Sequence, residues 1–260
     1  MRYMLLTDIG DAREINEDSI LLSNSEGSIQ VSNSPNLIKD GDIAAPVCAL
    51  VFDGMGGHNA GEHASHQAVV SFKEILDLFF SKVSLSIEES FKILAEAFEK
   101  ADNAIQEIGA DNPPLQGLGS TIAGFLYGSA LGLITFHAGD SRVYHFKNGI
   151  SRCLTTDHNL YQSLIKSGQI AKEGEGAALT NCLGGGVQGN YLEIKQHTNF
   201  TPDPGSILYT CTDGIHGFVD PDTLDNLLEE TPFQDLSQAL SKAIRKNGAK
   251  DNFSGIFIGF

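Results

Sequence analysis

Short apolar runs bounded by turn residues recur along the chain, a pattern typical of buried strands. Most of these runs are joined by short, turn-rich connections instead of long amphipathic segments, which favours antiparallel sheets. The pairs Gly128-Ser129 and Asn148-Gly149 predict hairpin turns of type II′ and type I′, respectively. Strands are predicted over residues 3–9, 18–22, 47–53, 120–127, 130–137, 142–146, 150–154, 191–197, 206–212 and 253–260.

Two long segments have apolar residues at helical spacing along one face. The first covers residues 61–80, and the second begins at a capping box formed by Ser86 and Glu89. Shorter helices are predicted near residues 221–229, where Pro221 suits the first turn, and over residues 234–246. Since each long helix has one apolar face, it can cover one side of a sheet. The pattern therefore predicts a layered α+β sandwich.

Three stretches depart from these patterns. Residues 23–46 are polar and turn-rich, so a surface excursion with at most a short hairpin is expected. Residues 168–190 are rich in glycine and predict a mobile flap. Residues 112–139 lack charged side chains and are long enough to imitate a membrane helix. However, the predicted turn at Gly128-Ser129 divides this stretch into two strands, so no membrane span is expected.

Composition limits the possible functions. The chain has 260 residues, of which 41% are hydrophobic and 19% charged, which is ordinary for a globular protein. With 33 acidic and 17 basic residues, the formal charge of −16 argues against nucleic-acid binding, which needs a basic face. The cysteines are widely spaced and form no C-x-x-C pair, which predicts a reduced, cytoplasmic protein. They are Cys48, Cys153, Cys182 and Cys211.

Aspartates recur where apolar strands meet turns. They are Asp18, Asp53, Asp140, Asp213 and Asp251. Each one alone has an ordinary explanation, because aspartate often begins a turn. Together they could converge at one edge of the sheets, and such a cluster would be unfavourable without bound cations. Mg²⁺ and Mn²⁺ prefer oxygen ligands, and neighbouring glycines let the backbone approach closely.

The order of the motifs also resembles a known family. REINED at 13–18, DGMGG at 53–57, LGST at 118–121, GDSR at 139–142, TTDHNL at 155–160, TDG at 212–214 and DNFS at 251–254 are similar to the motifs of the PPM family. Its members are metal-dependent serine/threonine phosphatases of the 2C type, and the likeness is to the bacterial branch. The resemblance implies a four-layer α-β-β-α sandwich of two mostly antiparallel sheets flanked by helix pairs. It also implies one catalytic domain over residues 1–260, with a flap at roughly 158–190.

The resemblance assigns metal ligands. It implies that Asp53 bridges two metal ions and that the carbonyl group of Gly54 binds one of them. Asp213 and Asp251 complete the ligands of one ion. The expected cofactors are two or three Mn²⁺ or Mg²⁺ ions.

Further roles follow from the same resemblance. Glu17 and Asp18 act around the other ion, largely through water, and Asp140 helps to hold a third, weaker one. Arg13 binds the substrate phosphate, a role that suits the planar fork of donors on its guanidinium group. Two ions that share a water lower its pKa and give a hydroxide, which attacks phosphorus in line. The catalytic residues implied are thus Arg13 and Asp53.

The expected substrates are phosphorylated proteins, and the enzyme would oppose a cytoplasmic serine/threonine kinase. Some family members have a histidine where this chain has Met55, which leaves the general acid unassigned. His58 is expected to be solvated and His158 to be structural. Two alternatives stay open: a catalytically silent phosphopeptide-binding module, and an acidic protein that holds Ca²⁺ for structural reasons. The calcium alternative has no EF-hand loop and gives Arg13 no purpose.

Overall fold

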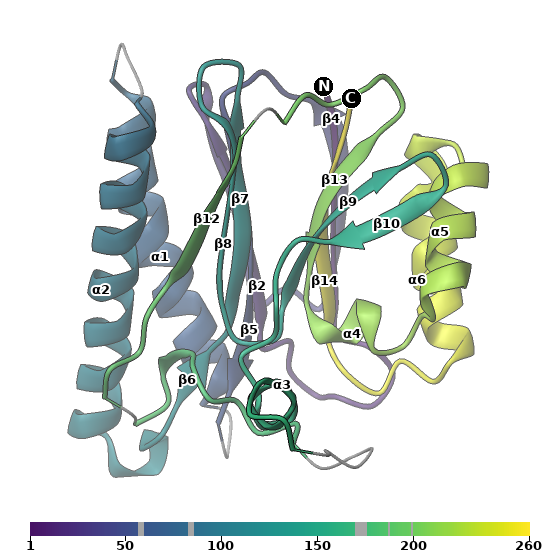
Figure 1. Ribbon diagram of the computed structural model, residues 1–260. Coiled ribbons are helices and arrows are strands. Elements are labelled where there is room, and N and C mark those ends of the chain that lie inside the picture. Colours follow the sequence, from purple (N-terminus) through teal and green to yellow (C-terminus); the bar gives the residue numbers. More distant parts are fainter. Residues whose placement is uncertain (57–59, 83–85, 170–175, 187, 199) are drawn as a thin grey trace.

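The computed structural model describes residues 1–56, 60–82, 86–169, 176–186, 188–198 and 200–260. Figure 1 shows four layers: a pair of long helices, two sheets face to face, and a second group of helices on the outer face of the other sheet. This arrangement confirms the predicted α+β sandwich of antiparallel sheets flanked by helices. Within the described residues, no helix is both long enough and apolar enough to cross a lipid bilayer.

The first sheet has six strands, and all of its pairings are antiparallel. Their order is β10 (Ile150–Cys153), β9 (Arg142–Lys147), β13 (Ile207–Cys211), β14 (Phe253–Gly259), β1 (Arg2–Asp8) and β4 (Asn36–Asp42).

The second sheet has eight strands and is also antiparallel throughout. Six of them follow the order β11 (Leu183–Gly184), β6 (Gly119–Ser120), β5 (Val47–Met55), β7 (Ile122–Gly128), β8 (Gly132–Ala138) and β12 (Glu193–His197). In addition, β2 (Asp18–Asn24) pairs with both β5 and β3 (Gly27–Ser32).

The two long helices pack side by side on the second sheet (Figure 1). As predicted, Oγ of Ser86 accepts a hydrogen bond from the backbone N–H of Glu89 and begins the second of them. The helices are α1 (Gly61–Phe80), α2 (Ile87–Asp111), α3 (Leu160–Lys166), α4 (Asp213–His216), α5 (Pro221–Glu230) and α6 (Leu236–Lys246), with 3₁₀ turns at Pro113–Leu115 and Phe233–Asp235.

The core consists of three apolar layers. Along β5, Leu50 and Phe52 face α1 and α2, whereas Ala49 and Val51 face the other sheet. This alternation follows from the two-residue period of a strand. The third layer, which contains Tyr209, lies between the first sheet and α5 and α6. Because the central strands are buried on both faces, they read as continuous apolar runs in the sequence.

The prediction of a surface excursion with at most a short hairpin over residues 23–46 is wrong in its detail. This stretch contains β3 and β4, which pair with different sheets and are therefore not a hairpin. Both lie at sheet edges, and β4 has side chains that are mostly exposed. An edge strand with exposed side chains needs no apolar run, so its sequence resembles that of a loop.

The two predicted hairpins form, but only one has the predicted turn. Asn148 and Gly149 both have positive φ, at 53° and 75°, as a type I′ turn requires. The other hairpin pairs Gly128 with Gly132 and has three residues between them. Its positive φ of 67° lies at Gly132, so the predicted two-residue type II′ turn at Gly128-Ser129 is wrong.

Candidate active site

Four strands bring acidic side chains to one end of the sandwich. Asp18 begins β2 and lies directly opposite Asp53 of β5 in the antiparallel ladder. In the facing sheet, Asp213 follows β13, and Asp251 precedes β14, its neighbour. Figure 1 shows α3 and α4 at this end, whereas both chain termini lie at the other. The predicted convergence of aspartates at one edge is therefore present.

Glycines allow two close backbone approaches beside these carboxylates. A Cβ on Gly54 would lie 2.0 Å from the carbonyl oxygen of Gly61, at the start of α1. A Cβ on Gly214 would lie 1.8 Å from the carbonyl oxygen of Asn252. Real Cβ atoms do not come this close to a carbonyl oxygen, so neither position has room for a side chain. The second approach joins the residues that follow Asp213 and Asp251.

The carboxylates surround a cavity of about 300 Å³. Every predicted site residue lines this cavity except Asp18, whose side chain is buried and does not reach its wall. The sequence analysis gave no role to four of the lining residues, which are Met55, Gly56, Thr121 and Leu179. The lining residues are Arg13, Glu17, Asp53, Gly54, Met55, Gly56, Thr121, Asp140, Leu179, Asp213 and Asp251.

Thr121 fixes the backbone at the centre of the site. Its N–H donates to the carbonyl oxygen of Asp53 at 2.8 Å, and its Oγ1 accepts from the N–H of Asp53 at 3.1 Å. The same hydroxyl lies 2.7 Å from Oγ of Ser141. The LGST motif marks Thr121 in the sequence, but no sequence signal marks Leu179, which comes from the predicted flap.

Burial and mutual repulsion both disfavour ionised carboxylates here. Burial raises the pKa of Asp18 to about 7, although hydrogen bonds from Ser254 and Thr212 oppose the shift. Burial, followed by repulsion from Asp18, raises the pKa of Asp53 well above its ordinary value. Burial and the nearby charge of Asp213 raise the pKa of Asp140 to about 7.

The donor set fits divalent cations. Oδ1 of Asp213 is buried and has no hydrogen-bond partner among the described residues. Such an orphaned oxygen is costly unless something binds it. Because burial and mutual repulsion raise the pKa of the Asp18, Asp53 and Asp140 carboxyl groups, a bound cation would favour their ionised form. Oxygen atoms from several carboxylates are the ligands that Mg²⁺ and Mn²⁺ take.

Arg13 lies at the mouth of this cavity. Its Nη2 lies 2.8 Å from both carboxylate oxygens of Asp251, and its Nη1 lies 3.6 Å from Oε2 of Glu17. The side chain is 45% exposed, so a ligand that enters the cavity can reach the guanidinium group.

Asp140 occupies the turn between β8 and β9. Its carbonyl oxygen accepts a hydrogen bond from Nε2 of His216, at 3.1 Å, which ties this turn to α4 and hence to Asp213. Burial lowers the pKa of His216 to about 4, so the ring is neutral at physiological pH. Of the other histidines considered, His58 lies outside the described residues, and His158 is buried away from the cavity.

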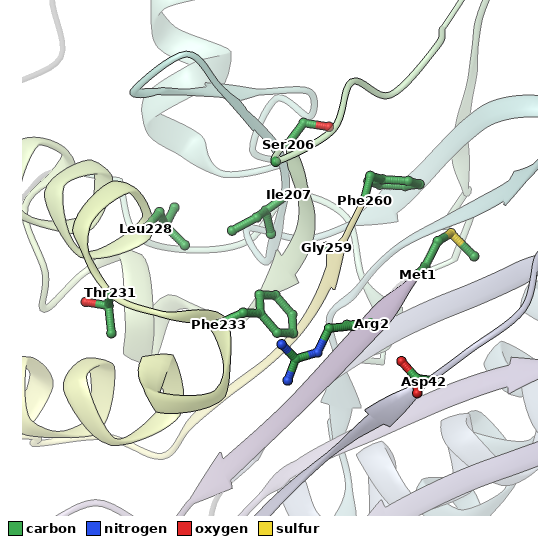
Figure 2. A pocket seen from close by; sticks show the side chains of 11 residues that line it. Met1, Arg2, Asp42, Ser206, Ile207, Leu228, Thr231, Phe233, Gly259 and Phe260 are labelled. Atoms are coloured by element: carbon green, nitrogen blue, oxygen red, sulfur yellow. The ribbon is translucent and has the colours of Figure 1, made fainter.

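A larger cavity, of about 440 Å³, lies at the end of the molecule that holds the termini (Figure 2). Ile207, Leu228 and Phe233 give it apolar walls. The guanidinium carbon of Arg2 lies 5.4 Å from the ring centroid of Phe233. None of the predicted site residues lines it, so size alone does not identify the active site.

Sequence comparisons find relatives named protein phosphatases. The serine/threonine phosphatase stp of Listeria innocua is 28% identical over 222 residues, which cover 80% of this chain and 82% of that one. A putative protein phosphatase 2C-type from Streptococcus pyogenes is 26% identical over 265 residues, which cover 98% of this chain and 95% of that one.

Solved structures share the fold. The serine/threonine phosphatase of S. agalactiae has a TM-score of 0.79 and 23% identity, with 99% of this chain and 98% of that one covered. The catalytic domain of the serine/threonine protein phosphatase PstP in complex with two manganese ions has a TM-score of 0.72 and 23% identity, with 98% and 97% covered. A family model described as protein phosphatase 2C matches residues 39–256. Since that match spans most of the 260 residues, the chain belongs to the protein phosphatase 2C family.

Proposed function

We propose that this protein phosphatase hydrolyses phosphoserine and phosphothreonine in proteins, and that the reaction takes place in the cavity around Asp53. The observation that supports this most is the convergence of six carboxyl groups and one accessible arginine at a single site. The relatives named serine/threonine phosphatases support the choice of substrate. We also propose that residues 1–260 form one catalytic domain.

The proposed metal ligands divide between the two sheets. Asp53 and the carbonyl group of Gly54 come from one sheet, and Asp213 and Asp251 flank strands of the other. Glu17 and Asp18 act around the second ion through water, because Asp18 does not reach the cavity wall. Two Mn²⁺ or Mg²⁺ ions are proposed, by analogy with the manganese complex of PstP. When bound, they would supply an acidified water as the nucleophile.

Asp140 is proposed as a ligand of a third, weaker ion. It lines the same cavity, but it projects from a turn and does not belong to the paired strands that carry Asp18 and Asp53. Because Asp140 is held by a turn and not by these paired strands, we expect the third ion to bind more weakly than the other two.

Arg13 is proposed to bind the substrate phosphoryl group. Its guanidinium carries donors in a planar fork that matches phosphate oxygens. In the structure two of these donors face Asp251 and Glu17. Cations bound to those carboxylates would compete for their oxygens and leave the guanidinium freer to hold a phosphoryl group. Arg13 would thereby orient phosphorus and offset the negative charge of its oxygens during the reaction.

The proposed partners are phosphorylated proteins and the serine/threonine kinase that modifies them. A cytoplasmic location is proposed as well. The four cysteines have free thiols, which suits a reducing compartment.

The test is hydrolysis of a phosphothreonine peptide in the presence of Mn²⁺. Activity is expected to vanish on chelation, to return with added metal, and to be lost in Asp53→Asn and Asp251→Asn. Hydrolysis that survives chelation or these substitutions would overturn the proposal. The alternative, a catalytically silent phosphopeptide-binding module, predicts that the peptide binds in excess Mn²⁺ without turnover.

A further inference from the structure

The side chain of His158 lies where three segments meet. It is 4% exposed and contacts the turn between β8 and β9, the segment 176–186 and the strand β12. The turn carries Asp140, and the segment carries Leu179. Both of these residues line the proposed catalytic cavity, whereas His158 does not.

His158 bonds both polar backbone groups of Gly139, the residue before Asp140. Its N–H donates to the carbonyl oxygen of Gly139 at 2.9 Å, and its ring Nδ1 accepts from the N–H of Gly139 at 3.4 Å. Gly139 has a φ of 112°, and a Cβ there would lie 2.7 Å from the side chain of Thr121. The turn before Asp140 is thus held in an unusual backbone conformation by His158 on one side and Thr121 on the other.

The same histidine holds the segment that carries Leu179. Its carbonyl oxygen accepts from the N–H of Thr180 at 2.9 Å, and its Nδ1 accepts from Nδ2 of Asn181 at 3.0 Å. The orientation of the Asn181 amide is fixed, because Nδ2 donates to the carbonyl oxygen of Tyr191 while Oδ1 accepts from its N–H. Nδ1 of His158 therefore faces two N–H donors.

These donors determine the tautomer of the ring. Since Nδ1 accepts hydrogen bonds, the ring hydrogen lies on Nε2, which donates to Oε2 of Glu193 at 3.2 Å. The ring also stacks on His137, with centroids 4.4 Å apart and planes inclined by 15°. Each position around the imidazole is thus occupied by a specific neighbour.

The side chains of His137, His158 and Glu193 are better explained by these hydrogen bonds than by a metal site. Ligand atoms of His137, His158 and Glu193 lie within 4.8 Å of one another. However, the lone pairs of imidazole nitrogens lie in the ring planes, and two nearly parallel stacked rings cannot direct them at one ion. In addition, Nε2 of His158 carries a hydrogen, and its Nδ1 faces donors, whereas the second nitrogen of a ligating histidine normally donates.

We propose that His158 is a positioning residue that couples Asp140 to Leu179, a role that rests on the proposed function. Its Nδ1 acceptor holds the turn that presents the Asp140 carboxylate and, through Asn181, the segment that places Leu179 against the catalytic cavity. The chemistry required at position 158 is an acceptor at the position of Nδ1. A donor at the position of Nε2 is less important for this role than the acceptor at Nδ1.

Two substitutions separate these requirements. In His158→Asn, Oδ1 can take the place of Nδ1 and accept from Gly139 and Asn181. In His158→Gln, the longer amide reaches towards Glu193 and lacks that acceptor. The matched control is His197→Gln, because His197 of β12 is also bonded through Nε2, to Oγ1 of Thr135 at 2.9 Å, away from the cavity.

The experiment measures kcat and KM on a phosphothreonine peptide, the Mn²⁺ dependence of the rate, and amide hydrogen exchange at residues 139–140 and 176–182. We expect His158→Gln to lower kcat/KM by about 10-fold or more and to require more Mn²⁺, as is typical when residues that orient ligands are lost. Exchange at the Gly139 amide should accelerate in this variant. His158→Asn should restore most of the rate and the slow exchange, and His197→Gln should match the wild type.

Equal losses in the Asn and Gln variants would overturn the proposal, as would losses that follow only the melting temperature. Unchanged exchange at Gly139 in His158→Gln would also contradict it. The exchange measurement needs no turnover. If the wild-type protein fails to hydrolyse any phosphopeptide, the proposed function fails, while the coupling through His158 is still tested.

Discussion

Asp213 has two properties that a surface aspartate lacks. One carboxylate oxygen is buried without a hydrogen-bond partner among the described residues, and burial and the charge of Asp251 raise its pKa. A carboxylate in this position destabilises the cation-free fold, since burial and the charge of Asp251 both disfavour its ionised form. Its presence makes sense if the energetic cost is offset by a bound cation.

Asp213→Asn should therefore have opposite effects with and without metal. We expect the free energy of unfolding to rise in the chelated protein, because one repelling charge disappears. The stabilisation by Mn²⁺ and the phosphatase activity should both be lost. Urea unfolding with chelator and with Mn²⁺ measures these effects, and Asp40→Asn on the exposed edge strand β4 is the control. A variant that is less stable under both conditions would show that Asp213 is structural.

Arg13→Ala should impair catalysis without unfolding the protein. The guanidinium is half exposed and makes its ion pairs at the cavity mouth, so its loss costs little stability. Loss of one preorganised donor to the phosphoryl group is expected to lower kcat by about 100-fold. Steady-state kinetics measure this, and Arg2→Ala, at the remote cavity of Figure 2, should leave the rate unchanged. Equal rates for the two variants would contradict the proposed role of Arg13.

Individual site residues differ in how far the sequence reveals them. Asp53 and Asp213 interrupt apolar strands beside a glycine, and this abrupt change from apolar to charged residues is visible without a structure. Leu179 has no such mark, because its place at the cavity depends on an isolated antiparallel bridge to Asn159 and on hydrogen bonds of its neighbours with His158 and Leu160. Those contacts join segments about 20 residues apart, and a local pattern cannot reveal them.

Close packing between strand ends gathers the carboxylates. The backbone after β13 touches the backbone before β14 at Gly214 and Asn252, and any Cβ at position 214 would force them apart. Asp213 and Asp251 are next to these contacts. The geometry of the site is therefore a property of how two strand ends meet.

Gly214→Ala should damage both stability and metal binding. Overpacking at a tight contact typically costs about 1–3 kcal/mol, and here the clash is with backbone, which cannot rotate away. We expect a lower melting temperature and a smaller shift on addition of Mn²⁺. The control is Gly149→Ala at an open hairpin tip, where the positive φ costs about 1 kcal/mol but leaves the Mn²⁺ shift intact. An undiminished Mn²⁺ shift in Gly214→Ala would count against the importance of this contact.

Elements were predictable where burial dictates the residue types. The strand β5 and the helices α1 and α2 each bury an apolar face, so their patterns predict them within a few residues. The edge strands β3 and β4 were missed, because backbone pairing holds them while their side chains stay partly or fully exposed. The turn after β7 was missed in type, since Gly132, beyond the predicted pair, adopts the positive φ.

For the whole molecule, the acidic site makes stability depend on pH and on metal together. Burial raises the pKa of both Asp18 and Asp140 to about 7, from the ordinary value of 3.8. The stability that such groups contribute is present below their unfolded pKa and is lost as pH rises through the folded pKa.

Without metal, the free energy of unfolding should accordingly fall between about pH 4 and pH 7, by up to about 1.4 kcal/mol per pH unit for each proton. With saturating Mn²⁺ the fall should be absent, because cations replace protons as the partners of the carboxylates. Urea unfolding at pH 5, 6, 7 and 8, with chelator or with Mn²⁺, measures both curves. Parallel curves would show that the metal and these carboxylates are unconnected.

The central claim is that folding gathers these separate aspartates into one site for divalent cations. The most direct test is anomalous diffraction from crystals soaked in Mn²⁺. The account predicts at least two manganese peaks in the cavity, both in contact with Asp53 and one of them also in contact with Asp213 and Asp251. An empty cavity, or manganese bound only elsewhere on the molecule, would contradict it.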